Sequence, residues 1–404
     1  MAIFNTTDFI SKYITGRQES LFKKDIEANY DLLKQKIDGK SVLVVGGAGT
    51  IGSSFIKAIL NFNPSKIYVI DINENGLTEL VRDVRSSNGL NVPKDFITYP
   101  INFGDTIFEK ILRNQAPFDI VANFAAHKHV RSEKDHYSIE AMIENNVIKA
   151  KKLLDLLLEF PPKHFFCVST DKAANPVNVM GASKKLMEDV ILAYSTKIPI
   201  TTARFANVAF SNGSLLFGFL ERIMKRQPLS SPSDVKRYFV SPEESGQLCM
   251  LACILGESGD IFFPKLNAED MKTFSEIAVD FLKQFGKKPF LCDSEKQAKE
   301  KASILSPSSK LYPVYFFKSD TSGEKHFEEF YTDKEELDLV RFKELGVVKN
   351  APKQKLEHIN KMFSSFQEVF NKNDVKKQDV IRILEQYIPN FEHIETGKSL
   401  DQKM

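Results

Sequence analysis

A glycine-rich turn between an apolar run and a helical pattern constrains this chain more than any other feature. The run Ser41–Val45 (SVLVV) leads directly into GGAGTIG. Glycines spaced in this way permit a tight turn, a close backbone approach to a pyrophosphate and tight packing of a helix on a strand. The start of the following helix offers free N–H groups to phosphate oxygens. The predicted contacts of this turn are Gly46, Gly49, Thr50, Ile51 and Gly52.

Six short apolar runs recur between residues 41 and 205, separated by stretches of helical length. They read SVLVV, KIYVI, DFITY, FDIVANF, KHFFCVS and IPITTARF. This alternation is typical of an α/β fold of the Rossmann type, a doubly wound parallel sheet with helices on both faces. With 404 residues and 42% hydrophobic content, the chain can also fill a smaller α/β domain.

These patterns divide the chain into four parts. Apolar residues at helical spacing predict a helical N-terminal extension over 1–40, which either packs on the body or contacts a partner. The Rossmann domain is expected over 41–206, and a smaller, mainly substrate-binding domain over 207–333. A helical C-terminal extension should occupy 334–404, with its last ten residues disordered.

An acidic residue ends the second apolar run. Asp71 lies nineteen residues beyond Gly52, where a carboxylate would accept hydrogen bonds from the adenosine ribose hydroxyls. The same charge repels a 2′-phosphate, so the sequence favours NAD over NADP.

Two further segments fit a dinucleotide that lies across the carboxyl edge of the sheet. Asn102 and Phe103 follow the third run, where they either lie beside the adenine or form a solvated loop. Ala125 and Ala126 follow the fourth run, and their small side chains would let the backbone lie against the cofactor.

Overall charge and cysteine usage narrow the protein class. The net charge of +2 gives no argument for nucleic acid or for an anionic membrane as a partner. No apolar stretch approaches 18 residues and no secretory signal is evident, so we expect a cytoplasmic protein. The four cysteines lack paired metal-ligand spacing, which predicts reduced core residues and no metal site.

A hydroxyl, a carboxylate and an amine follow one another at Thr170, Asp171 and Lys172, directly after the fifth apolar run. This set is suited to acid/base catalysis, although a helix cap or a solvated turn uses the same residue types. Met180 and Lys184 are four residues apart in a predicted helix and therefore share a face. A methionine at that spacing is either a core residue or part of a site.

Together these segments resemble the extended short-chain dehydrogenase/reductases, and among them the UDP-N-acetylglucosamine 4,6-dehydratases of bacterial polysaccharide synthesis. The strings that carry the resemblance are VGGAGTIG, DIVANFAAHKHV, STDKAANPVNVMGASK, RFANVAFSNGS, KRYFVSPEES and TSGEKHFEE. They occur in the family's order, and the third of them is the most specific.

The resemblance implies a reaction and a role for each central residue. A tightly bound NAD would oxidise C4 of the sugar and return the hydride to C6 after water is lost across C5 and C6. Thr170 would hydrogen-bond the O4 oxygen, Asp171 would protonate the departing C6 hydroxyl, and Lys172 would remove the C5 proton. Lys184 would bind the nicotinamide ribose. Many relatives carry a catalytic tyrosine at the place of Met180, whereas the amino-sugar dehydratase branch includes members with methionine.

The remaining matches would form the pocket for a UDP-sugar. The resemblance points to Lys128, Asn207, Ser214 and Arg237 as substrate contacts. The plain alternative for Lys128 is a surface lysine, and for Arg237 it is a solvated charge at the edge of the molecule. Relatives usually carry arginine at the place of Thr321, so the diphosphate contact differs here.

A homo-oligomer is expected. The sequence also leaves two alternatives to a 4,6-dehydratase open. A nucleotide-sugar 4-epimerase or reductase would not need the Lys172 base and would depend on the missing tyrosine. A non-catalytic NAD-binding scaffold would explain that missing tyrosine and the helical extensions.

Overall fold

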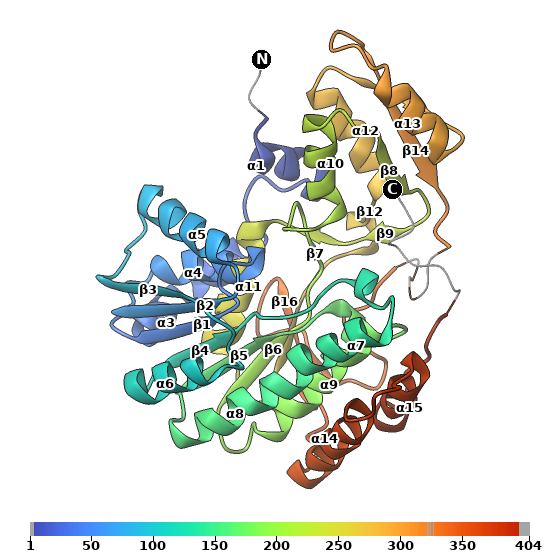
Figure 1. The fold of residues 1–404 in the computed structure, drawn as a ribbon. Helices are drawn as coiled ribbons and strands as arrows, with labels where there is room; N and C mark the ends of the chain where they lie inside the picture. The colour runs from blue at the N-terminus through green and yellow to red at the C-terminus, as the bar shows by residue number, and fades with distance from the viewer. Residues whose placement is uncertain (1–3, 321–322, 324, 326, 396–404) are drawn as a thin grey trace.

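A nine-stranded sheet forms the centre of the computed structural model, which describes residues 4–320, 323, 325 and 327–395 (Figure 1). Its seven strands from β11 to β3 run parallel, and β16 pairs antiparallel with both β11 and β15. Across the sheet, the strands are β15 (Leu337–Asp338), β16 (Leu345–Val348), β11 (Ile261–Pro264), β6 (Ile200–Ala203), β5 (His164–Val168), β4 (Ile120–Asn123), β1 (Ser41–Val45), β2 (Lys66–Asp71) and β3 (Asp95–Pro100). The six predicted runs are strands β1 to β6, and the doubly wound α/β fold is confirmed.

Both faces of the sheet are covered by helices because side chains alternate along each strand. In β1, Leu43 and Val45 join one hydrophobic core, while Val42 and Val44 join the other. The first core is closed by α6 (Thr106–Gln115), α7 (His136–Ile143), α8 (Lys149–Glu159) and α9 (Val179–Ala193), and the second by α3 (Tyr30–Ile37), α4 (Thr50–Leu60), α5 (Glu74–Ser86) and α11 (Pro242–Leu255).

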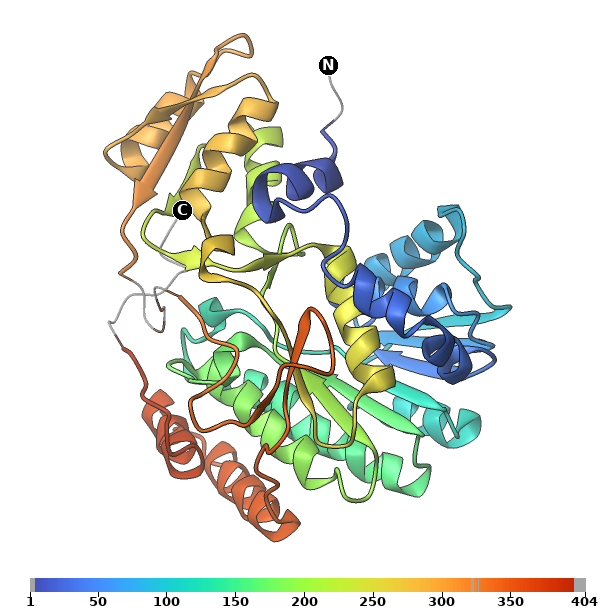
Figure 2. The same cartoon turned by 180° about the vertical axis from the view of Figure 1, so that it is seen from behind.

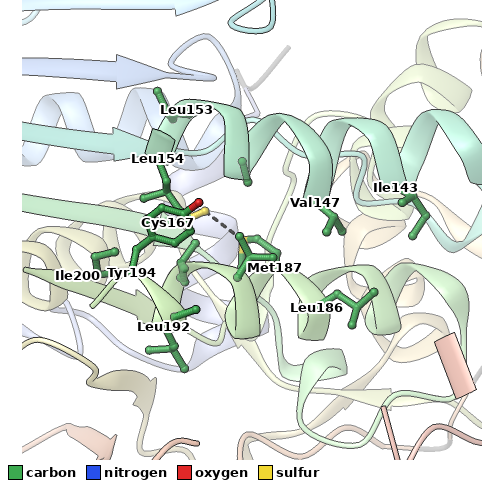
Figure 3. Close-up of a cluster of buried hydrophobic side chains, with 14 of the residues drawn as sticks. Ile143, Val147, Leu153, Leu154, Cys167, Leu186, Met187, Leu192, Tyr194 and Ile200 are labelled. Carbon is green, nitrogen blue, oxygen red and sulfur yellow. Dashed lines mark hydrogen bonds between the residues drawn. The ribbon is translucent and has the colours of Figure 1, made fainter. Parts of the chain in front are cut away.

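Figure 3 shows the first core, where side chains of α8, α9 and the sheet interdigitate. The thiol of Cys167 on β5 lies 3.0 Å from the sulfur of Met187 on α9. Burial raises the pKa of the Cys167 thiol to about 11, which keeps it protonated. All four cysteines are free and buried, as predicted.

The smaller α/β domain is built on a parallel three-stranded sheet. It comprises β13 (Lys288–Leu291), β14 (Leu311–Phe317), β8 (Leu229–Pro232), α10 (Leu215–Met224), α12 (Phe274–Gln284) and α13 (Glu295–Ser303). Two short strand pairs, β7 (Asn207–Val208) with β10 (Phe239–Val240) and β9 (Lys236–Arg237) with β12 (Lys272–Thr273), lie between this domain and the large sheet (Figure 1).

The N-terminal extension packs against both halves of the molecule (Figure 2). Phe9 of α1 (Thr6–Phe9) and Ile14 of the following π-helical turn are buried in the core of the smaller domain. Phe22, just before α2 (Lys23–Ala28), and Leu33 of α3 are buried beneath the large sheet. Packing on the body, rather than an open helical surface, therefore accounts for these apolar residues.

The C-terminal part differs from the expectation of an all-helical extension over 334–404. Its first portion forms β15 and β16, because Val347 and Val348 alternate into the two cores of the large sheet. Helices begin only with α14 (Leu356–Phe370) and α15 (Lys377–Tyr387), which pack against α9 (Figure 1). Strands β11 and β16 thus extend the Rossmann sheet with chain from beyond residue 206. The predicted disordered end falls on residues 396–404, outside the described residues, apart from Glu395.

Candidate active site

The glycine-rich turn lets the ends of β1 and β4 approach each other. Gly46 has a φ of +76°, and a Cβ at this position would lie 2.4 Å from the backbone nitrogen of Ala125. A Cβ at Gly52 would lie 2.4 Å from the carbonyl oxygen of Gly46, where helix α4 begins. Neither position can hold a larger residue without a backbone shift.

A cleft of about 220 Å³ opens at the carboxyl edge of the sheet, where the strand order reverses between β1 and β4. All the predicted cofactor contacts line it except Lys184. They are Gly46, Gly49, Thr50, Ile51, Gly52, Asp71, Asn102, Phe103, Ala125 and Ala126.

The donors and acceptors of this cleft fit a dinucleotide. Gly49 is the N-cap of α4 and no described side chain caps that helix, so its first N–H groups are directed at the cleft. The Asp71 carboxylate accepts hydrogen bonds at 2.9 Å from the N–H groups of Ala48 and Asn73. These two bonds hold the acid beside the glycine turn, where a ribose hydroxyl would meet it.

A loop from the smaller domain bridges the mouth of the cleft. The N–H of Asn212 donates to the Thr50 hydroxyl at 3.0 Å, and its carbonyl accepts from the Lys128 ammonium at 3.1 Å. Ser214 follows as the N-cap of α10, where its hydroxyl accepts from the N–H of Phe217. The loop thereby joins the predicted substrate contacts Lys128 and Ser214 to the glycine-rich turn.

Thr170, Asp171 and Lys172 converge at the end of β5. The Thr170 hydroxyl donates to Asp171 Oδ1 at 2.7 Å, and Lys172 Nζ lies 3.0 Å from the same oxygen. The backbone N–H of Lys172 also donates to Asp171 Oδ1, at 2.9 Å. The Asp171 side chain is 4% exposed and that of Lys172 is 16% exposed, so this group is shielded from water yet reachable.

A second carboxylate meets Lys172 from a distant part of the chain. Glu328 Oε1 lies 3.6 Å from Lys172 Nζ and 3.9 Å from the Arg237 guanidinium, and both Glu328 and Arg237 are buried. Arg237 also donates to the carbonyl oxygens of Lys236 and Lys325. Arg237, predicted as a substrate contact, is therefore held inside this charged cluster.

Protonation within the cluster follows from burial and from the neighbouring charges. Burial acts to lower the pKa of Lys172, but Asp171 and Glu328 outweigh it, so the pKa is raised and the ammonium form is stabilised. Burial raises the pKa of Glu328, and the nearby Asp171 raises it further. The surroundings of Glu328 therefore push its carboxyl toward the protonated form.

Met180 and Lys184 lie one turn apart on α9, as predicted, and both are buried. The Met180 side chain belongs to the first hydrophobic core, and its N–H donates to Glu133 at 2.9 Å. Lys184 Nζ donates to the Val168 carbonyl at 2.6 Å, at the end of β5, and burial lowers its pKa. Lys184 is thus fixed at Val168, the end of β5, which lies two residues before Thr170.

Sequence reasoning did not single out Glu328. It lies within the TSGEKHFEE string, yet only the residue at 321 was considered there, and that position is outside the described residues. The remaining predicted contact, Asn207, is half-buried on β7, where its N–H donates to Tyr238.

Metal ligands and membrane-spanning helices are both absent from the part of the chain that the structure describes. Within residues 4–320, 323, 325 and 327–395, no three His, Cys, Asp or Glu side chains are grouped so as to hold a metal ion. In the same ranges no helix is long and apolar enough to cross a bilayer.

Comparison with known sequences identifies relatives over most of the chain. The profile of a family described as polysaccharide biosynthesis protein matches residues 42–348. An uncharacterised membrane protein of Methanocaldococcus jannaschii is 34% identical over 62% of this chain and 74% of its own length. The capsular polysaccharide biosynthesis protein CapD of Staphylococcus aureus is 28% identical over 84% of this chain, which spans only 56% of CapD. An inverting UDP-N-acetylglucosamine 4,6-dehydratase of Campylobacter jejuni is 27% identical over 57% of this chain and 68% of its own length.

Solved structures share the fold at low sequence identity. Pen from Bacillus thuringiensis superposes with a TM-score of 0.63 at 19% identity, covering 82% of this chain and 98% of its own. The UDP-glucuronic acid 4-epimerase of Bacillus cereus, in complex with UDP-glucuronic acid and NAD, gives a TM-score of 0.54 at 19% identity, covering 72% of this chain and 90% of its own. Both are Rossmann-like α/β proteins in the region they share with this chain.

Proposed function

Because this chain belongs to the polysaccharide biosynthesis protein family of extended short-chain dehydrogenase/reductases, we propose that it is an NAD-dependent nucleotide-sugar 4,6-dehydratase. The expected substrate is a UDP-N-acetylhexosamine, and UDP-N-acetylglucosamine is the favoured one. The product is a 4-keto-6-deoxy sugar nucleotide. The relatives include a UDP-N-acetylglucosamine 4,6-dehydratase and a UDP-glucose 4-epimerase, and the structurally similar UDP-glucuronic acid 4-epimerase of Bacillus cereus is a complex with NAD. The homo-oligomeric state stays a prediction.

The observation that carries the proposal is the acid/base set at the end of β5. A dehydratase must move one proton at C5 and another at the C6 oxygen, and Lys172 and Asp171 supply an amine and a carboxylate 3.0 Å apart. An epimerase has no need for a base at C5. The buried Met180 cannot transfer a proton, which also disfavours an epimerase that depends on a tyrosine there.

The glycine turn, Asp71 and the start of α4 are the residues that would hold NAD, and NAD would take a hydride from C4 and return it to C6. Lys184, whose Nζ donates to the Val168 carbonyl at the end of β5, is the proposed contact of the nicotinamide ribose. Lys128, Asn207, Ser214 and Arg237 are the proposed contacts of the UDP-sugar.

The hydrogen bond from Thr170 to Asp171 supports a route for the O4 proton in place of the missing tyrosine. As C4 is oxidised, Thr170 accepts the O4 proton and passes its own hydroxyl proton to Asp171 Oδ1, 2.7 Å away. Asp171 then gives that proton to the C6 oxygen, which leaves as water. Lys172 removes the C5 proton and later returns one to C5, so each group ends the cycle as it began.

The proposal is tested by incubating the pure protein with UDP-N-acetylglucosamine and measuring product mass and proton NMR. We expect loss of one water, and incorporation of solvent deuterium at C5. Lys172→Ala should retain NAD but lose the C5 exchange, because no other amine lies at Asp171 among the described contacts. An unchanged mass with inversion at C4 would identify an epimerase instead.

A further inference from the structure

The Lys172 ammonium lies between two carboxylates, although its proposed role requires a free amine. Its Nζ is 3.0 Å from Asp171 Oδ1 and 3.6 Å from Glu328 Oε1. A base at C5 must first lose a proton, so one of these neighbours has to accept it.

Asp171 Oδ1 is already occupied by hydrogen-bond donors. It accepts from the Thr170 hydroxyl, from the Lys172 backbone N–H and from Lys172 Nζ. Asp171 is also the proposed acid at C6, and the proton that it carries there comes from O4.

The surroundings of Glu328 differ from those of Asp171. It is 5% exposed, and it is positioned by the buried Arg204, whose guanidinium donates at 3.0 Å to the carbonyl of Phe330, two residues further on. The charges that face it are Lys172, Asp171, Arg237 and Lys325. Burial and Asp171 favour the neutral carboxyl, while the three cations oppose it, and Arg237 and Lys325 are both engaged with backbone carbonyls as well.

On the basis of the proposed dehydratase function, we propose that Glu328 accepts the proton of Lys172 and so frees the amine that acts at C5. The Nζ–H bond of Lys172 breaks and an O–H bond forms on Glu328 Oε1, which converts the ion pair into a neutral pair. The amine then takes the C5 proton while the C5–H electrons form the C5–C6 double bond and the C6–O bond breaks. When Lys172 returns a proton to C5, the neutral pair is restored. Glu328 acts through Lys172 and is therefore a positioning residue.

A proton acceptor and a purely electrostatic partner predict opposite changes in rate when Glu328 is removed. If Glu328 only attracted the ammonium, its removal would make Lys172 easier to deprotonate and the enzyme faster at neutral pH. If Glu328 accepts the proton, its removal leaves water as the acceptor, and the enzyme becomes slower at neutral pH and recovers as the pH rises.

The test compares Glu328→Gln with the wild type and with Glu329→Gln, a matched change of the adjacent exposed carboxylate, which binds Asn175. With UDP-N-acetylglucosamine, kcat and C5 deuterium incorporation are measured from about pH 6 to about pH 10. We expect Glu328→Gln to lower kcat about 100-fold at neutral pH with little change in KM, and to approach the wild-type rate at the alkaline end. Glu329→Gln should follow the wild type, and Glu328→Asp should recover part of the loss. A Glu328→Gln enzyme that is as fast as wild type at neutral pH, or equally slow at every pH, overturns the proposal.

A second measurement needs no turnover and separates this proposal from the dehydratase function. Lysine labelled with ¹³C at Cε reports the protonation of Lys172 by NMR in the purified protein. In the wild type the Lys172 signal should titrate in two coupled steps, and in Glu328→Gln in one step. One unaltered step in both proteins would refute proton sharing, whether or not the wild type dehydrates UDP-N-acetylglucosamine.

Discussion

His164 begins strand β5, and its Nε2 lies 2.9 Å from the hydroxyl oxygen of Thr201 on β6. That hydroxyl donates to the carbonyl of Ala252, so it accepts from His164, which fixes the neutral tautomer with a proton on Nε2. Burial lowers the pKa of His164 to about 4, and the nearby Lys36 acts in the same direction. A single residue of the central sheet thus links stability to pH.

We expect the protein to lose stability as the pH falls from about 6.5 to about 4. The folded pKa lies below the unfolded value of about 6.5, so the unfolded chain takes up the proton first. The contribution is complete above pH 6.5, and its loss should be about 3 kcal/mol. Urea unfolding at a series of pH values measures it. His164→Gln, which keeps a donor toward Thr201, should flatten the slope in this window, and an identical slope in that variant would assign the effect to other groups.

At the scale of elements, helix α4, which follows the glycine-rich turn, is held by its contact with α11. The two helices touch closely because Gly246 of α11 lies against the backbone of α4. A Cβ at Gly246 would lie 2.2 Å from the carbonyl oxygen of Ser54. Helix α11 comes from chain beyond the first six strands, so a later segment fixes the helix that presents the phosphate-binding turn.

Gly246→Ala should destabilise the protein by about 1–3 kcal/mol and weaken NAD binding, because the methyl group forces α4 and α11 apart. Gly218→Ala is the matched control. Gly218 lies inside helix α10, and apart from its own helix's backbone and its chain neighbours no atom of the described residues stands within 4 Å of the place that a methyl group would take. Alanine should therefore be neutral or stabilise by about 0.5–1 kcal/mol. Thermal unfolding and NAD titration measure both effects. Equal stability of the two variants would show that the helix contact has room to relax.

Across the whole molecule, the buried Arg204 joins segments that are far apart in sequence. Its guanidinium binds Glu188 of α9 at 2.9 Å and Glu335 at 2.8 Å, in addition to the Phe330 carbonyl. Ser169, next to the acid/base set, donates to the same Glu188 at 2.6 Å. This network ties β5, β6 and α9 to the segment that carries Glu328.

Arg204→Met should lower the free energy of unfolding by about 3–5 kcal/mol, because it leaves the buried Glu188 with only its longer 3.9 Å ion pair to Lys185. Adding Glu188→Gln should recover part of that loss by removing the buried charge. Arg113→Met, which breaks the exposed pair with Glu159, should cost at most about 1 kcal/mol. Urea denaturation compares the variants. A similar cost for Arg204 and Arg113 would contradict the role assigned to this network.

The sequence by itself determined the features that depend on neighbouring residues. Alternating apolar runs encoded strands β1 to β6, glycine spacing encoded the turn after β1, and the four-residue interval placed Met180 and Lys184 on one helix face. Each of these follows from local backbone periodicity, which a short stretch of sequence contains in full.

Only the tertiary structure decided which distant segments meet. Residues 337–348 were expected to be helical and instead complete the large sheet, because a strand edge was available to pair with them. Lys172 and Glu328 stand in separate strings with no spacing rule between them, yet the folded chain brings them to 3.6 Å. Such contacts arise from burial of charge and apolar surface in the assembled chain, and no local pattern of residues records them.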